Sequence, residues 1–168
     1  YEAISDAAAD CLPAETQIPL EVLPKEGPEV VFPALPEQIA FTDEPVSRLL
    51  RGDREGFFVE NDRILHAREE PYEITVCWQK NENYVVQRKT VTIRVSRAER
   101  FSEPGKPKVV YDKTAGRWLL IAEEGVEFST DGETWTSEPR LEELPEQIWY
   151  RFAQTQDYLP SPEKILVP

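Results

Sequence analysis

The stretch Gly125 to Trp135, G-V-E-F-S-T-D-G-E-T-W, carries the clearest fold signal in the chain. Its apolar residues Val126 and Phe128 alternate with polar neighbours, which is typical of a β-strand with one buried face. Asp131-Gly132 is a favoured pair for a two-residue hairpin turn, because both central positions of that turn need a positive φ. The sequence therefore predicts a β-hairpin with strands at 126–129 and 134–136.

Alternating hydrophobicity also predicts a long antiparallel hairpin upstream. The residues Tyr72, Ile74, Val76 and Trp78 share one face of a strand over 72–78. A turn at 80–83 leads into a second strand over 84–95 with Val91, Ile93 and Val95 inward. A shorter hairpin is expected at 57–65 with its turn at Asn61-Asp62, and further strands at 108–111, 118–122, 148–155 and 164–167.

Proline and glycine usage supports an all-β chain divided into short segments. There are fifteen prolines and seven glycines, and proline is confined to loops and strand edges in such folds. Only 2–10 and 43–51 have a helical pattern, and both are short. The alternation stops after Val95, and 101–107 has the composition of a linker. We therefore expect two domains, 1–100 and 101–168.

A short internal repeat suggests that the two halves are related. The heptapeptide L-P-E-Q-I-A-F at 35–41 recurs as L-P-E-Q-I-W-Y at 144–150. In both copies a turn is expected to lead into a strand.

The 125–135 stretch, together with I-W-Y-R-F-A at 148–153, resembles the Ig-like or fibronectin-III-like repeats of bacterial secreted and cell-surface proteins. Their pattern runs roughly E-Y-S-x-D-G-G-x-T-W and then Y-x-x-x-A-R. The resemblance covers about 103–168 of this chain. It implies small β-sandwich domains in tandem that act as spacers or binding modules rather than as enzymes.

Charge and hydropathy exclude several classes of partner. The formal net charge is −13, and acidic residues are spread over both halves, so the chain repels phosphate backbones and nucleic acid is not an expected partner. No apolar run is long enough to cross a bilayer. The chain contains no Met and opens on Tyr1, which predicts a fragment or mature form of an exported protein whose targeting signal or anchor lies outside it, although a fragment boundary alone would give the same sequence. We expect a monomer.

The two cysteines, Cys11 and Cys77, are not spaced as metal ligands, which leaves a disulfide or two free thiols. Alternation places Cys77 on the outer face of the 72–78 strand. With the extracellular location that the resemblance implies, we expect a Cys11–Cys77 disulfide. The alternative is a pair of unrelated thiols, with Cys77 packed beneath a loop.

Candidate catalytic and metal-binding residues are few. Asp131 with Glu133, and Asp53 with Glu55, place two carboxylates in a loop, but calcium needs six to eight oxygen ligands. Asp131 is expected to bond to turn amides. The 129–135 stretch also approaches the Asp-box pattern S-x-D-x-G-x-T-W with one residue missing, and that motif is a structural element. The only histidine, His66, has no catalytic motif around it.

Other acidic pairs are sequence neighbours that face opposite ways on a strand, unlike a glycosidase pair; they are Glu69-Glu70, Glu123-Glu124 and Glu142-Glu143. The four tryptophans, Trp78, Trp118, Trp135 and Trp149, are expected in the core, although one on the surface would offer a platform for a sugar ring. No cofactor and no metal are expected.

The sequence thus favours two tandem Ig-like β-sandwich domains in a non-catalytic extracellular spacer or adhesion module. Its protein or glycan ligand is not identified by any motif. The main alternative is a carbohydrate-binding accessory region of a larger secreted enzyme, and the third is a small glycan-processing enzyme. An exposed aromatic strip would favour the second, and convergent carboxylates in a cleft would favour the third.

Overall fold

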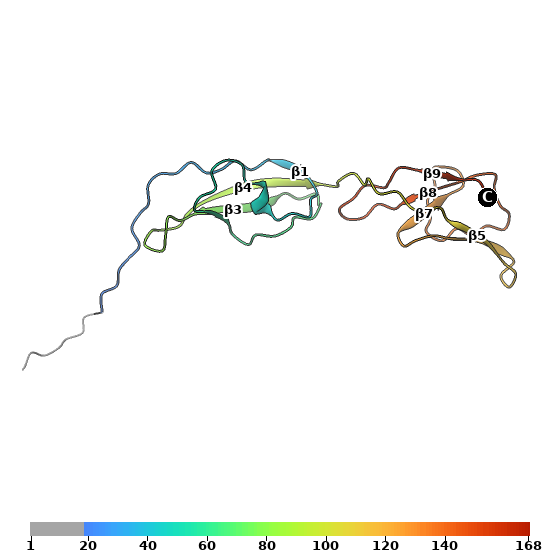
Figure 1. The fold of residues 1–168 in the computed structure, drawn as a ribbon, viewed down its shortest axis with the longest axis horizontal. Helices are drawn as coiled ribbons and strands as arrows, with labels where there is room; N and C mark the ends of the chain where they lie inside the picture. Colours follow the sequence, from blue (N-terminus) through green and yellow to red (C-terminus); the bar gives the residue numbers. More distant parts are fainter. Residues whose placement is uncertain (1–18) are drawn as a thin grey trace, which may run out of the picture.

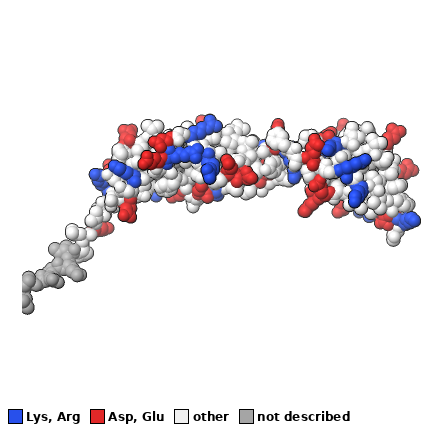
Figure 2. Space-filling model, in the orientation of Figure 1, with Lys and Arg blue, Asp and Glu red and all other residues white. Residues whose placement is uncertain are grey.

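The structure is a computed structural model that describes residues 19–168. The described chain is built from β-strands, and its only helical element is one turn of 3₁₀ helix, η1 (Val46–Leu49). This confirms the predicted all-β class. Figure 1 shows two lobes placed end to end and joined by an extended segment. Figure 2 shows acidic and basic side chains interspersed over both lobes.

The first lobe is built on the predicted long hairpin. Its strands are β1 (Gln38–Ala40), β2 (Phe57–Val59), β3 (Tyr72–Trp78) and β4 (Gln87–Ser96), in the sheet order β1-β4-β3-β2. Strands β3 and β4 are antiparallel from the Tyr72–Ile93 pair to the Trp78–Gln87 pair. Strand β1 lies parallel to β4, with Gln38 opposite Arg94. The predicted inward residues Ile93 and Val95 are buried, as expected.

The inner face of this sheet is covered by connecting segments. Val46 and Leu50 from the η1 region, and Leu65 and Ala67 from the segment before β3, pack against the strands. These residues remove the inner sheet face from water, which is the main favourable term in folding.

The hairpin expected at 57–65 is only half correct. Phe57–Val59 forms β2, but this strand pairs with β3, and Phe58 lies opposite Cys77. Asn61 has a φ of 54° and turns the chain away from the sheet. The carbonyl of Arg63 then accepts a hydrogen bond from the Val46 amide at 3.1 Å. Residues 63–65 therefore hold η1 in place and form no strand. The helix expected at 43–51 is reduced to the η1 turn, and the one expected at 2–10 lies outside the described residues.

The second lobe contains two sheets that face each other across a separate core. One sheet consists of β5 (Lys108–Asp112) and β6 (Arg117–Ile121); the other consists of β7 (Val126–Ser129), β8 (Ile148–Phe152) and β9 (Lys164–Leu166). The strand positions predicted from the sequence are confirmed for all five. Val109, Trp118 and Leu120 pack against a buried cluster, whose members are Val126, Phe128, Leu141, Ile148, Tyr150, Phe152 and Leu166.

The return strand predicted at 134–136 is reduced to one bridged residue. Thr136 exchanges two backbone hydrogen bonds with Phe128, at 2.8 and 2.9 Å, and β7 otherwise pairs with β8. A two-residue hairpin turn requires a positive φ at both central residues. Here Gly132 has a φ of 79°, whereas the only non-glycine residue with a positive φ in the described chain is Asn61. The chain consequently makes a wider loop at Asp131.

The heptapeptide repeat has the same packing role in both lobes. Its first, fifth and seventh residues contact the core of their own lobe: Leu35, Ile39 and Phe41 in the first, and Leu144, Ile148 and Tyr150 in the second. The strands that follow are paired differently, because β1 is parallel to β4 whereas β8 lies antiparallel between β7 and β9. The repeat therefore reflects a shared use of apolar positions within two different sheets.

The two cores predict two separable effects on stability. Ile93 and Ile148 are completely buried, each in its own cluster. Ile93→Ala and Ile148→Ala should each lower the free energy of unfolding by about 2–5 kcal/mol. Amide hydrogen exchange should accelerate in β3 and β4 for the first variant and in β7–β9 for the second. Equal acceleration in both lobes for either variant would show that the cores form one cooperative unit.

Candidate functional site

The two lobes are joined by a set of contacts around Asp157, in the loop between β8 and β9. This loop extends toward the first lobe alongside the connecting segment (Figure 1). One carboxylate oxygen of Asp157 accepts a hydrogen bond from the Ala67 amide at 2.9 Å, and the other lies 2.8 Å from Nδ1 of His66. Both His66 and Ala67 belong to the first lobe. We call the contacts between residues 155–159 and the first lobe with its connecting segment the joint.

The backbone of the connecting segment is part of the joint. The Ala98 amide donates to the Asp157 carbonyl at 2.8 Å, and the Leu159 amide donates to the Ala98 carbonyl at 2.9 Å. Nε of Arg97 donates to the Thr155 carbonyl at 3.0 Å. Ala98 thus forms an isolated parallel β-bridge with Tyr158, and the rotational freedom of the segment at this residue is correspondingly reduced.

Aromatic packing adds to these polar contacts. The Phe41 ring stacks on the His66 ring with centroids 5.8 Å apart, and the edge of Tyr158 meets the same Phe41 ring at 5.4 Å. The guanidinium of Arg100 lies 4.1 Å from the centre of the Phe152 ring. Phe41 is the last residue of the first heptapeptide copy, so this copy supplies the ring against which Tyr158 of the second lobe packs.

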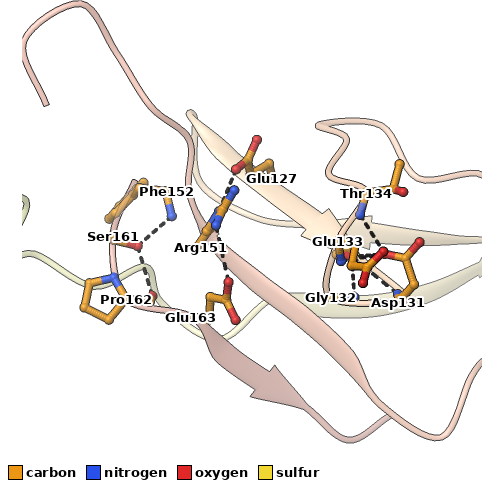
Figure 3. Close-up of polar contacts among 11 residues, drawn as sticks. Glu127, Asp131, Gly132, Glu133, Thr134, Arg151, Phe152, Ser161, Pro162 and Glu163 are labelled. Carbon is orange, nitrogen blue, oxygen red and sulfur yellow. Dashed lines mark hydrogen bonds and ion pairs between the residues drawn. The ribbon is translucent and has the colours of Figure 1, made fainter. Parts of the chain in front are cut away.

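The Asp157 loop is held in shape by its own hydrogen bonds. Thr155 and Tyr158 exchange two of them: the Thr155 amide donates to the Tyr158 carbonyl at 3.0 Å, and the Tyr158 amide donates to the Thr155 hydroxyl at 3.1 Å. At the base of the loop, the buried Ser161 hydroxyl accepts from the Phe152 amide at 2.8 Å (Figure 3). The carboxylate of Asp157 is therefore positioned before the lobes meet, which lowers the entropic cost of the contact.

A second ordered element is the loop that follows β7 (Figure 3). Oδ1 of Asp131 accepts hydrogen bonds from the Glu133 and Thr134 amides at 2.8 and 2.7 Å, and from the Ser129 hydroxyl at 2.8 Å. The Ser129 hydroxyl in turn accepts from the Gly132 amide at 2.8 Å. Asp131 thus bonds to turn amides, as the sequence predicts.

These hydrogen bonds favour the ionised form of Asp131. The Thr134 and Glu133 amides, followed by the Ser129 hydroxyl, hold the pKa of Asp131 well below its usual value. The hydrogen bonds to one oxygen of this carboxylate hold the loop in shape and stabilise its negative charge, which is a structural role.

Arg151 organises the outer face of the β7–β8–β9 sheet. Its guanidinium pairs with Glu127 at 2.7 Å and with Glu163 at 3.3 Å (Figure 3). It also lies 3.8 Å from the centre of the Trp135 ring, so one face of that indole is covered by the cation. This cluster was not identified in the sequence, since its four members are distant along the chain.

The tryptophans do not form an exposed strip. Trp78 is buried, and its indole N–H donates to the Glu55 carbonyl at 3.2 Å. The other three, Trp118, Trp135 and Trp149, are each partly buried. The rings of Trp118 and Tyr111 also pack together, with their centroids 5.0 Å apart.

The most exposed aromatic side chain on the described surface is that of Phe101, with 88 % of it accessible. It lines a groove of about 690 Å³ beside the joint, together with Glu99, Arg100, Arg151 and residues 159–163. Two arginines and two glutamates balance the charge of this groove.

Two other candidate acids, Asp53 and Glu123, accept hydrogen bonds from backbone amides. Oδ1 of Asp53 accepts from the Glu55 amide at 3.0 Å, which closes a local turn. A carboxylate oxygen of Glu123 accepts from the Gly105 amide at 2.6 Å. Within residues 19–168, no three histidine, cysteine or acidic side chains gather as a metal site would require.

Cys77 is buried, with 1 % of it exposed, although it lies on the outer face of β3. Its burial is a feature that the alternation of the sequence does not predict. Its cross-strand neighbours Phe58 and Arg88, together with nearby Glu60, account for this. Burial raises the pKa of the Cys77 thiol, and the charge of Glu60 raises it further. Cys11 lies outside the described residues, so the Cys11–Cys77 disulfide stays a prediction.

Comparison of the chain with protein-family models, curated proteins and solved structures found no match. No helix within residues 19–168 has the length and apolar character needed to cross a membrane.

The Asp131 loop predicts a specific acid sensitivity. Because the pKa of Asp131 is lower in the folded state than in the unfolded state, its ionisation stabilises the fold fully above about pH 5, and this contribution is lost as the pH falls below about 4. Asp131→Asn should therefore destabilise the protein at neutral pH. The difference in the free energy of unfolding between the variant and the original protein should become smaller in acid, as measured by denaturant unfolding across pH. A gap that is constant down to pH 2 would contradict this assignment.

Proposed function

We propose that the chain is a non-catalytic spacer or adhesion module of a bacterial secreted or cell-surface protein. It would consist of two Ig-like β-sandwich domains, 1–100 and 101–168. The resemblance of the 125–153 region to bacterial surface repeats supports the extracellular setting. The observation that carries the proposal is the joint, because a spacer must hold its domains at a fixed angle and distance.

The chemistry of the joint fits a mechanical role. The Asp157 carboxylate accepts one bond from a backbone amide and faces Nδ1 of His66, which donates when it carries a proton. The His66 imidazole, the only histidine, is thus engaged in holding two lobes together, a use that differs from acid–base catalysis.

Proteolysis of the connecting segment tests the joint. Asp157→Ala leaves the Ala67 amide and Nδ1 of His66 without their partner, at a cost of about 1–3 kcal/mol. Opening of the joint releases the peptide bond between Arg97 and Ala98, because the Ala98 amide and carbonyl are both hydrogen-bonded in the closed joint. Trypsin cleavage there should accelerate by about 5- to 150-fold, because proteolysis follows the population of the open form.

Asp43→Ala is the matched control, because Asp43 is an exposed acid of the first lobe outside the joint. Its cleavage rate should equal that of the original protein. Equally fast cleavage in the original protein and in Asp157→Ala would show that the joint is open in solution, and the spacer proposal would lose its support.

The groove at Phe101 favours a second candidate, a carbohydrate-binding accessory region. A ring exposed beside paired arginines and glutamates offers a stacking surface next to hydrogen-bonding groups, which suits a neutral sugar. Phe101→Ala should abolish retention on insoluble cellulose, xylan or chitin, whereas Phe58→Ala, which removes an exposed ring from the first lobe, should not. Absence of retention of the original protein on all three polysaccharides would eliminate this candidate.

A further inference from the structure

A small cavity in the second lobe lies between β6 and the segment that follows the Asp131 loop. This segment is anchored at both ends: Thr136 is paired with Phe128, and the Leu141 carbonyl accepts from the Trp118 amide at 2.8 Å. Between these anchors, residues 137–140 pass beside β6. Together with β6 they border a partly open cavity of about 340 Å³, lined by Arg117, Leu119, Leu120, Ser137, Glu138, Pro139 and Arg140.

Two arginines line this cavity, and neither of them forms an ion pair with an acidic residue of the described chain. Nε of Arg117 is buried and has no hydrogen-bond acceptor. Neither Arg117 nor Arg140 forms an ion pair among the described residues, although Glu138 lines the same cavity. Both guanidinium groups are always charged. A buried donor without an acceptor is costly, so the arrangement favours an acceptor group bound beside Arg117, and the positive charge of Arg140 at the same cavity favours one that is an anion.

The lining indicates the kind of anion. A guanidinium presents a planar fork of N–H donors that matches the two oxygens of a carboxylate. Leu119, Leu120 and Pro139 offer an apolar wall to a carbon skeleton, and the Ser137 hydroxyl and Glu138 carboxylate offer partners for hydroxyl groups. The volume lies at the small end of ligand sites, with room for one sugar ring.

We propose that this cavity binds the carboxylate of a uronic acid in an acidic glycan, with Arg117 and Arg140 as its cationic partners. The proposal names a ligand class for the adhesion role and rests on that role for its biological setting. Its geometry involves none of the joint residues. The proteolysis experiment therefore reports on the joint, and a binding experiment reports on this cavity.

The test is a titration of the whole chain with trigalacturonic acid, followed by nuclear magnetic resonance, with a neutral galactose trisaccharide as the matched ligand. The acidic trisaccharide should bind and shift the resonances of residues 117–120 and 137–140. Binding should weaken as salt is raised, because the attraction is between charges. The neutral trisaccharide should not bind.

Matched variants assign the contact. Arg117→Gln and Arg140→Gln should each weaken binding by about tenfold or more, because each removes charge-assisted hydrogen bonds. Arg117→Lys should bind more tightly than Arg117→Gln and less tightly than the original protein, because lysine keeps the positive charge but lacks the forked N–H donors of the guanidinium. Arg54→Gln, which removes an exposed arginine from the first lobe, should bind as the original protein does.

The proposal would be overturned by no detectable binding of trigalacturonic acid, by equal binding of the neutral trisaccharide, or by unchanged affinity in Arg140→Gln. Arg140 is exposed, so that variant keeps the test valid if Arg117→Gln fails to fold. Acetate binding as tightly as the trisaccharide would reduce the site to one for a bare carboxylate and would reject the glycan.

Discussion

The arrangement of this chain depends on one carboxylate. Asp157 reaches from the second lobe to the Ala67 amide and the His66 ring of the first, at 2.9 and 2.8 Å. Without this carboxylate, the lobes would still be linked by the connecting segment. The contacts left between them would include the backbone hydrogen bonds of Ala98, the hydrogen bond from Arg97 to Thr155 and the packing of Tyr158 on Phe41. The bonds at Ala98 also satisfy backbone groups that an unpaired linker would leave to water. The connecting segment is therefore fixed at Ala98, where it pairs with the second lobe.

Local pattern was enough to find the strands, because alternation records which face of a strand is buried. The 72–78 strand has the predicted bounds, and the strands of the second lobe lie within a few residues of theirs. The pattern does not record which strands pair. Residues 57–59 and 63–65 look like two arms of a hairpin, yet β2 pairs with β3, and Arg63 bonds to Val46 instead. Alternation also placed Cys77 on the outer face of β3 but could not show that neighbouring side chains bury it.

The joint and the two-arginine cavity could not be predicted, for a different reason. Asp157 and Ala67 are 90 residues apart in the chain, and nothing around Asp157 distinguishes it from other loop acids. His66 was identified as a residue without a motif, and its role follows only from what faces it. Phe101 was assigned to a linker by composition, and its exposed ring becomes informative only beside Arg151 and Leu159. Asp131, by contrast, was predicted well, because its partners lie within three residues.

Residual dipolar couplings of backbone amides test most directly whether the two lobes behave as one body. If the joint is closed, amides of β3 and β4 and amides of β7 and β8 should fit a single alignment tensor with the lobes arranged as in Figure 1. The magnitude of alignment obtained from the first lobe should equal that obtained from the second. Two tensors of different magnitude or orientation would mean that the lobes move independently, and a fixed spacer could not be built from this chain.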